Sequence, residues 1–134
     1  MQLVPGLALL ASASAATTSC VTGATGFLAS ELISQLLERG HTVKATVRSL
    51  ADPSRVAYLL ALPAAAEQLS LLEADLLKEG AFDSCVEGAQ YIIHTASPFV
   101  TEGITDPELQ LIAPALNGTR NVFESIRRLS LIHI

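Results

Sequence analysis

Hydrophobic and polar positions follow two different periods along this chain, and each period predicts a type of element. Between 41 and 48, apolar residues at every second position predict a strand. A helix is predicted before it, because apolar residues recur at helical spacing at Leu28, Leu32, Ile33, Leu36 and Leu37. Gly40 follows at the position where a left-handed residue commonly ends a helix.

Strands and helices alternate along the rest of the chain. Short apolar segments predict three more strands, at 20–22, 69–74 and 91–94. The last of these is apolar enough to be covered on both faces of a sheet. Three helices are predicted between and after them, at 53–62, 82–86 and 107–128. An aspartate followed by proline begins the first and the last of these helices. This alternation predicts an α/β fold with a parallel sheet built from right-handed crossover units.

Composition narrows the class of protein. The chain has 134 residues, which is enough for one modest domain or for part of a larger protein. Half of the residues are hydrophobic and only 4% are aromatic, so we expect an aliphatic core and no intrinsic disorder. The net charge of −5, with no basic run, argues against a non-specific nucleic-acid surface. No apolar run reaches about 18 residues, so we expect no membrane span and a cytoplasmic protein.

The two cysteines carry no evident chemistry at this level. Cys20 and Cys85 form neither a disulfide framework nor a pair with metal-ligand spacing. Each lies in an apolar stretch, so we expect two small buried side chains and no metal site.

Both ends of the chain differ from its middle. Residues 1–18 are low in complexity and contain a short apolar stretch, but the first basic residue is Arg39. We therefore expect a leader there and leave open a targeting peptide. Residues 129–134 read LSLIHI, which is what a transposon-end sequencing adapter encodes, so we expect an adapter-derived tail. The remaining residues, 19–128, are expected to form one truncated domain.

The segment TGATGFLA at 22–29 carries the clearest chemical signal. It follows a predicted strand and opens a predicted helix, which is the context that a dinucleotide fingerprint requires. Two glycines would allow a tight turn and a close approach to a pyrophosphate, which the amides at the helix N-terminus would bind. The expected contacts are Gly23, Thr25, Gly26, Phe27 and Leu28. The structural alternative is a turn glycine followed by a glycine at a helix start. The fingerprint predicts a Rossmann-type doubly wound parallel sheet, of which this chain holds the N-terminal four-strand part.

The end of the second predicted strand favours NADP over NAD. An NAD enzyme places Asp or Glu there, about 20 residues after the glycines, to bind the ribose 2′-hydroxyl. Here the strand ends in Arg48, whose guanidinium suits a 2′-phosphate, and Arg55 is a candidate for a second contact. Asp52 is the only nearby acid and is better explained as a helix cap. Either arginine is otherwise a solvated surface residue.

With these residues in view, the chain resembles the N-terminal part of an extended short-chain dehydrogenase/reductase of the NAD-dependent epimerase/dehydratase superfamily. Within that group it is most similar to the dihydroflavonol reductase and cinnamoyl-CoA reductase branch. The resemblance rests on VTGATGFLA at 21–29, ATVRS at 45–49, EADLLKEGAFDSCVEGAQYIIHTASPF at 73–99 and APALNGTRNVF at 113–123. The pairing of an EGxFD helix with an HTASP strand end is the most specific of these features.

The resemblance implies further roles for individual residues. Asp75 and Leu76 would lie beside the adenine ring. The ribose and nicotinamide side of NADP would be lined by His94, Thr95, Ala96 and Ser97. Asn121, in the last helix, would be structural. The implied reaction is hydride transfer between NADPH and an aldehyde, a ketone or a CoA thioester.

The catalytic residues of this family are a Tyr-x-x-x-Lys pair and a serine, in which the tyrosine donates a proton and the lysine lowers its pKa. Four residues after Tyr58 and Tyr91 stand Leu62 and Thr95, so neither tyrosine supplies the pair. We therefore assign no catalytic residue. The chain alone is expected to be inactive and, with an unpaired strand edge at 91–94, to self-associate.

The sequence thus predicts the cofactor-binding half of an NADP-dependent carbonyl reductase acting on a small molecule. Three alternatives remain open. A nucleotide-sugar epimerase or dehydratase of the same superfamily is disfavoured by Arg48 and by HTASP. A non-catalytic NADP sensor would explain the missing Tyr-x-x-x-Lys pair. A structural fragment without a ligand is the third.

Overall fold

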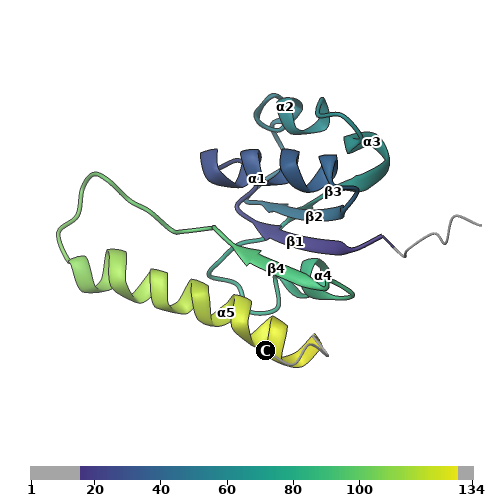
Figure 1. Ribbon diagram of the computed structural model, residues 1–134. Helices are drawn as coiled ribbons and strands as arrows, with labels where there is room; N and C mark the ends of the chain where they lie inside the picture. Colours follow the sequence, from purple (N-terminus) through teal and green to yellow (C-terminus); the bar gives the residue numbers. More distant parts are fainter. Residues whose placement is uncertain (1–15, 130–134) are drawn as a thin grey trace, which may run out of the picture.

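The computed structural model describes residues 16–129 as an open parallel sheet with helices on both faces (Figure 1). The elements are β1 (Thr18–Thr22), α1 (Phe27–Glu38), β2 (Thr42–Val47), η1 (Pro53–Arg55), α2 (Ala57–Leu60), α3 (Ala65–Gln68), β3 (Leu69–Glu73), α4 (Asp83–Val86), β4 (Tyr91–His94), η2 (Glu108–Ile112) and α5 (Ala113–Leu129). The strand order is β3-β2-β1-β4, and all three pairs are parallel. This is a Rossmann-type α/β fold, as the sequence predicts.

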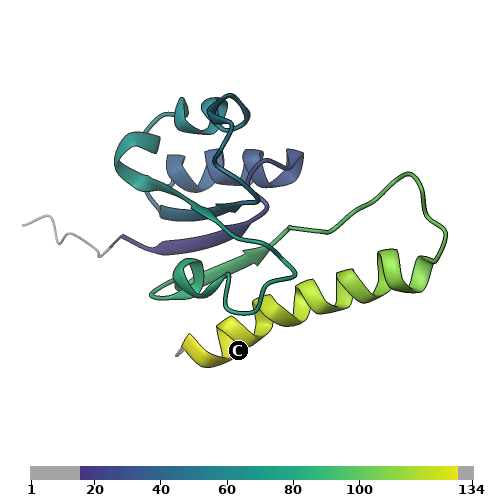
Figure 2. The same ribbon diagram turned by 180° about the vertical axis from the view of Figure 1, so that it is seen from behind.

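Two layers of helices cover the sheet (Figures 1 and 2). Helices α1, α2 and α3 lie on one face, and α4 and α5 lie on the other. The first layer is filled by an aliphatic cluster that includes Val21, Ala29, Ile33, Val43 and Leu59. The second is filled by a smaller cluster that includes Cys20, Phe82, Cys85, Val86 and Val122. Strands β1, β3 and β4 therefore contribute alternate side chains to two separate cores, whereas β2 contributes to the first core only.

Helix α1 confirms the predicted pattern most closely. Its buried residues include Ile33 and Leu37, which lie on the predicted apolar face. Gly40 has a φ of +79°, and its amide donates to the Leu37 carbonyl while the His41 amide donates to the Leu36 carbonyl. Satisfying these last carbonyls through a left-handed residue is a common way to end a helix.

The helix predicted over 53–62 is broken in the structure. Asp52 caps it as expected, because its carboxylate accepts a hydrogen bond from the Ser54 amide at 3.1 Å. The following residues form the single turn η1 and then the short helix α2, since only Val56 and Leu59 reach the core. Helix α3 is not predicted by the pattern, because the four residues of this turn bury only one side chain.

The last helix begins as predicted and contains an irregular first turn. The Asp106 carboxylate accepts hydrogen bonds from the amides of Glu108 and Leu109, at 3.1 and 3.3 Å. The residues of η2 then form a π-helical turn directly before Pro114. Proline has no amide hydrogen and its ring excludes the carbonyl four residues earlier, which explains a widened turn at this point.

The expectation about the cysteines is wrong. Cys20 and Cys85 are joined by a disulfide between β1 and α4, with their Cα atoms 5.4 Å apart, instead of being two free side chains. A separation of 65 residues hides this proximity in the sequence, and only the packing of α4 on β1 brings the cysteines together.

The expected covering of β4 on both faces is found in part. Ile93 packs against the first cluster and Ile92 against the second, but both are only half-buried and Tyr91 is exposed. Within residues 16–129, β4 pairs with β1 alone and is an edge of the sheet.

The predicted leader and tail lie mainly outside the described residues. Within residues 16–129, β1 begins at Thr18 and α5 ends at Leu129. No helix in this range is long and apolar enough to cross a membrane.

Candidate cofactor-binding site

The carboxyl ends of the parallel strands carry the predicted glycine segment. Gly23 has a φ of +73°, and a Cβ atom there would lie 2.9 Å from the Ala96 Cα atom. Gly26 donates its amide to the Gly23 carbonyl at 2.9 Å and is the N-cap of α1. We call residues 23–26 the glycine turn. Its first position admits only glycine, because a side chain would be strained and would displace the segment after β4.

A buried threonine of the neighbouring strand holds this turn in place. The Thr46 carbonyl of β2 accepts the Ala24 amide at 2.8 Å, and the Thr46 hydroxyl accepts the Gly23 amide at 3.3 Å. Thr46 is 2% exposed. The turn therefore has a fixed conformation without a ligand.

The N-terminus of α1 opens onto the same edge. The first helical hydrogen bond runs from the Ser30 amide to the Gly26 carbonyl, so the amides of Phe27, Leu28 and Ala29 precede it. No side chain caps this end, and its first turn contains no acidic residue. The side chains of Phe27 and Leu28 are exposed. These features suit an anion, because free amides and the positive end of the helix dipole point outward together.

A second threonine closes the site on the side of β4. The Thr22 hydroxyl oxygen lies 3.1 Å from the amide nitrogens of Thr95 and Ala96, and 2.7 Å from His94 Nδ1. The Thr95 hydroxyl donates in return to the Thr22 carbonyl. The segment after β4 is therefore fixed against the glycine turn. Sequence reasoning did not single out Thr22 or Thr46, although Thr22 stands directly before the glycine pattern.

Arg48 and Arg55 extend into solvent beyond the end of β2. Both are exposed, and neither side chain makes a hydrogen bond or an ion pair within residues 16–129. Nearby carboxylates bond elsewhere: Glu73 accepts the Leu50 amide at 2.6 Å, and Asp52 accepts both polar hydrogens of Ser54. The Ser54 hydroxyl, then the Ser54 amide and, least, the charge of Arg55 hold the pKa of Asp52 below its usual range. The Arg48 guanidinium is therefore available to an anion, and that of Arg55 is available while it also interacts with the Asp52 charge.

The residues predicted beside the adenine ring are partly engaged within the chain. Asp75 accepts the Leu77 amide at 2.9 Å, and this fixes the bend after β3. The side chain of Leu76 packs under α5, where a Cβ atom on Gly118 would lie 3.2 Å from Leu76 Cδ2. Its carbonyl accepts a hydrogen bond from Asn121 at 2.7 Å, which is the structural role expected for this asparagine.

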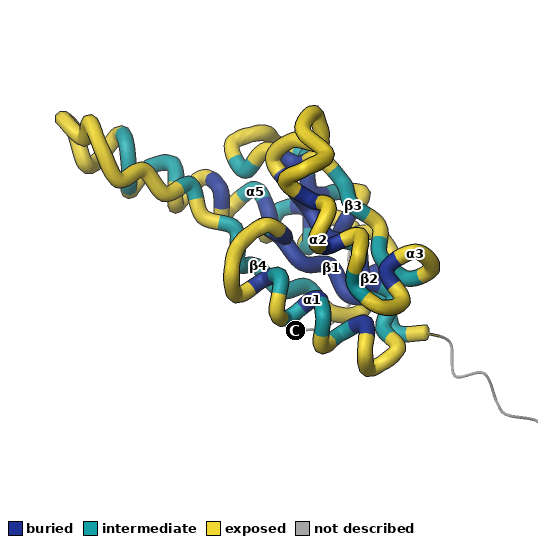
Figure 3. Tube along the Cα trace, turned by 90° about the horizontal axis from the view of Figure 1, so that it is seen from above, coloured by how far each residue is buried: buried dark blue, intermediate teal, exposed yellow. Residues whose placement is uncertain are grey.

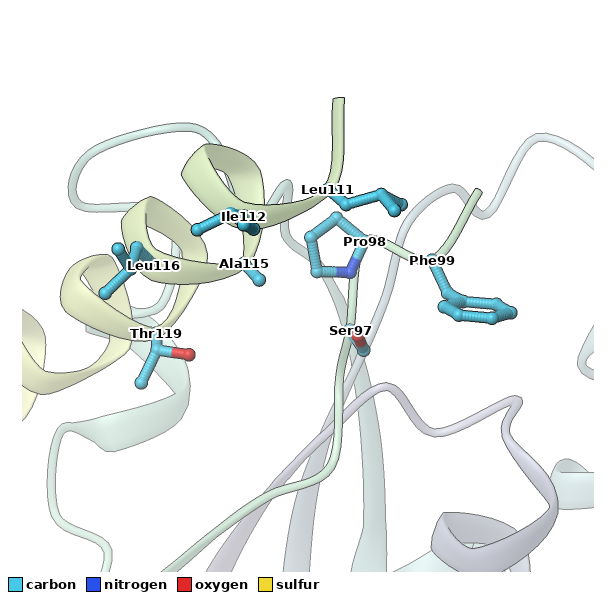
Figure 4. Close-up of a pocket in the computed structure, with 8 residues that line it drawn as sticks. All are labelled: Ser97, Pro98, Phe99, Leu111, Ile112, Ala115, Leu116 and Thr119. Carbon is cyan, nitrogen blue, oxygen red and sulfur yellow. The ribbon is translucent and has the colours of Figure 1, made fainter. Parts of the chain in front are cut away.

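An apolar hollow lies between the segment after β4 and the last helix (Figure 4). Its volume is about 540 Å³, and Ser97 is at its lower edge beside the end of β4. The other lining residues are Pro98, Phe99, Leu111, Ile112, Ala115, Leu116 and Thr119. Sequence reasoning identified only Ser97 among these eight residues. For the lining residues on the last helix, the helical spacing of Ile112, Leu116 and Thr119 was a signal available in the sequence.

The strand order and the glycine turn between β1 and α1 define a Rossmann-type α/β domain. The chain belongs to the NAD dependent epimerase/dehydratase family, whose model matches residues 19–133. It is 55% identical to cinnamoyl-CoA reductase CAD2 of Medicago truncatula over 106 residues, which are 79% of this chain and 32% of that protein. It is 47% identical to dihydroflavonol 4-reductase of Dianthus caryophyllus over 108 residues, with 81% and 30% of the two chains covered.

Solved structures give the same relationship. The chain superimposes on Gre2 from Candida albicans in complex with NADPH with a TM-score of 0.72 and 37% identity, covering 84% of this chain and 33% of that one. Vestitone reductase from alfalfa, Medicago sativa, matches with a TM-score of 0.69 and 34% identity, covering 86% and 34%. The chain therefore spans about a third of the length of the relatives that it matches.

Proposed function

We propose that this chain is the cofactor-binding part of an NADP-dependent carbonyl reductase. The observation that carries the proposal is the position of Arg48 directly after β2. Its side chain has no hydrogen bond or ion pair within residues 16–129, and it lies at the carboxyl ends of the strands, where the glycine turn presents free amides. A 2′-phosphate distinguishes NADP from NAD, and a guanidinium binds it as a charge-assisted, bidentate donor. No acid occupies the position at which an NAD enzyme would bind the ribose hydroxyls.

Each group of site residues at the carboxyl ends of the strands has a role in this proposal. The free amides of Phe27 and Leu28 bind the pyrophosphate, with Gly23, Thr25 and Gly26 shaping the turn beneath it. Arg48 and Arg55 bind the 2′-phosphate. The bend at Asp75 and Leu76 borders the adenine, and residues 95–97 border the ribose and nicotinamide. When bound, NADPH supplies a hydride to the substrate carbonyl.

The substrate is an aldehyde, a ketone or a CoA thioester in this proposal. Support comes from the names of the relatives, since cinnamoyl-CoA reductase and dihydroflavonol 4-reductase both act on carbonyl groups. The apolar hollow next to Ser97 suits the apolar part of such a molecule. This chain contains no Tyr-x-x-x-Lys pair, and Tyr91 lies at the amino end of β4 beside Ser19, far from the glycine turn in the strand register. We therefore propose that the chain alone binds the cofactor but does not oxidise it.

Titration of the chain with NADPH and with NADH tests the cofactor assignment. NADPH should bind more tightly, and Arg48→Gln should weaken NADPH by about 10- to 100-fold, since a hydrogen bond to a charged group contributes about 1.5–3 kcal/mol. Binding of NADH should change little. Arg127→Gln is the matched control, because Arg127 pairs only with Glu124 on the exposed side of α5. Equal affinity of the unmodified chain for NADPH and NADH would contradict the NADP assignment.

An assay of NADPH oxidation with a panel of aldehydes, ketones and thioesters tests the second part. We expect binding without turnover. Turnover by this chain would show that a proton donor other than a Tyr-x-x-x-Lys pair operates.

A further inference from the structure

The hydrogen bonds of the Thr22 hydroxyl determine the protonation of His94. This hydroxyl has three polar neighbours, namely the amides of Thr95 and Ala96 and the Nδ1 atom of His94. A hydroxyl offers one hydrogen and two acceptor lone pairs, and a backbone amide can only donate. The two amides therefore occupy the lone pairs, and the single hydrogen must point to His94 Nδ1. His94 is then a neutral ring that carries its proton on Nε2.

This arrangement lies in the wall of the proposed cofactor site. Thr22 is fully buried, and the amides that it accepts begin the segment predicted to border the ribose and nicotinamide. Ala96 also supports the glycine turn, because there is no room for a Cβ atom between it and Gly23. A shift of this segment would move both walls of the site. Thr22 and His94 therefore control the position of residues that would touch the cofactor.

Protonation of His94 would disrupt this set of bonds. A protonated imidazole carries a hydrogen on both nitrogens, so Nδ1 would face the Thr22 hydroxyl as a donor. The hydroxyl cannot accept from three donors with two lone pairs, and one of the amides of Thr95 and Ala96 would lose its partner. Burial alone lowers the pKa of His94, which keeps the ring neutral in the folded chain.

Within residues 16–129, no charged side chain adds to or opposes the effect of burial on the pKa of His94. Strand β1, the sheet partner of β4, has no ionisable group, because Cys20 is bonded to Cys85. The ionisable side chains in and beside the helices that cover this face, α4 and α5, are Lys44, Glu79, Asp83, Glu87, Arg120, Glu124, Arg127 and Arg128. None of them contributes to the lowered pKa of His94.

We propose that His94 is a positioning residue of the cofactor site, and that the site binds its dinucleotide fully only while His94 accepts the Thr22 hydroxyl hydrogen at Nδ1. The inference rests on the proposed function, because it concerns the binding of NADPH at this edge. Its structural part, the assignment of the proton to Nε2, is independent of any ligand.

Nuclear magnetic resonance of the imidazole nitrogens tests the structural part. In the chain labelled with ¹⁵N-histidine, we expect His94 at pH 7.5 to have a bare Nδ1 and a protonated Nε2. His94→Asn removes these signals and so assigns them. A neutral ring protonated at Nδ1 would overturn the proposal, whether or not a cofactor binds.

The pH dependence of NADPH binding tests the positioning role. Asparagine places an acceptor oxygen near the position of Nδ1 and does not titrate, so His94→Asn should bind NADPH without the His94-dependent loss at low pH. Over the pH interval in which the nitrogen spectra show His94 taking up its second proton, the Kd of the unmodified chain should rise about fivefold more than that of His94→Asn, the effect of one net hydrogen bond. The comparison is made between the two proteins because the 2′-phosphate of NADPH itself titrates near pH 6.

Matched variants separate this role from general effects of histidine. His41 is also paired through Nδ1 with a hydroxyl, that of Ser19 at 2.9 Å, but it lies beyond the amino end of β2. His41→Asn should therefore keep the pH profile of the unmodified chain. Thr22→Ser keeps the hydroxyl and should retain the profile, whereas Thr22→Val should bind weakly at every pH.

The measurements distinguish an error in the His94 positioning role from an error in the proposed NADPH binding. If His94→Asn keeps the full pH dependence of the unmodified chain, the positioning role is wrong while NADPH binding stands. If no protein in the series binds NADPH or NADH at any pH, the proposed function and the positioning role are both wrong, while the nitrogen spectra still decide the proton assignment.

Discussion

The two long helices, α1 and α5, are attached to the sheet in different ways. Helix α1 lies flat on its face of the sheet over its whole length, and its buried residues Ala29, Ile33 and Leu37 are spaced one turn apart. Helix α5 is buried against the other face from Gly118 onward, at Gly118, Val122 and Ser125. Its first turns and η2 extend past the sheet edge (Figure 3). We call residues 108–117 the overhang.

The side chains that hold the two helices also differ. Apolar contacts suffice for α1, whose amphipathic stripe matches the sheet. Polar contacts fix α5 at several points. The Asp83 carboxylate accepts from the Ser125 hydroxyl at 2.6 Å and from Arg128 at 2.9 Å, and Asn121 donates to the Leu76 carbonyl. In the overhang, by contrast, Leu109, Ile112 and Leu116 remain exposed.

Both helices carry apolar side chains at helical spacing, but this chain buries those of α1 and leaves those of the overhang exposed. Every apolar position of the α1 stripe after Leu28 packs against the first core, so pattern and packing agree from Leu32 to Leu37. In the overhang the same kind of pattern meets no sheet within residues 16–129, and part of it lines the hollow next to Ser97. Free energy of unfolding should therefore depend strongly on the first stripe and weakly on the second.

Reduction of the disulfide should have the largest effect on stability. The bond closes a loop of 65 residues and joins β1 to α4 beneath α5, so its loss should lower the free energy of unfolding by about 4 kcal/mol. Thermal melting with and without a dithiol reductant measures this change. Cys20→Ala/Cys85→Ala is the control and should melt at the same temperature under both conditions. Two free thiols in the chain unfolded without reductant would contradict the disulfide.

Truncation of matched aliphatic residues tests the comparison of the two helices directly. Ile33→Ala should destabilise the chain by about 3 kcal/mol, since it leaves a cavity in the larger core. Leu116→Ala in the overhang should change the free energy of unfolding by less than about 0.5 kcal/mol. Denaturant titration of both variants measures the two values. Equal losses would show that the overhang is packed as tightly as α1.

The polar attachment of α5 should give the smallest of the three effects. Asp83→Ala removes the acceptor of Ser125 and Arg128, and we expect a loss of about 1–2 kcal/mol because the buried Ser125 hydroxyl loses its partner. Glu124→Ala is the matched control, since its pair with Arg127 is exposed and should contribute less than about 1 kcal/mol. Hydrogen exchange of α5 amides would locate the change. Protection lost in α1 instead of α5 would contradict this assignment.

Local pattern predicted the regular elements around the site. The alternating apolar residues of β2, the stripe of α1 and the capping residue Asp52 were all identified from the sequence, because each depends on neighbours within one or two turns of chain. The glycine pattern of residues 23–26 was found for the same reason. These features determine where the turn lies and which end of α1 faces it.

Long-range packing decided the rest. The disulfide, the incomplete burial of β4 and the break between η1 and α2 depend on which elements meet in space, and no local spacing encodes that. The bond from Thr22 to His94 spans 72 positions and needs β1 and β4 to be neighbours in the sheet.

The sequence by itself therefore determined the fold class, the family and the end of the sheet at which the glycine turn lies, since short-range periodicity and the glycine segment carry that information. Only the tertiary structure decided how this end is held. Thr46 fixes the glycine turn, Thr22 fixes the segment after β4, and the protonation of His94 follows from the count of donors around one hydroxyl. Hydrogen bonds between distant residues have a geometry that appears only after the strands have paired.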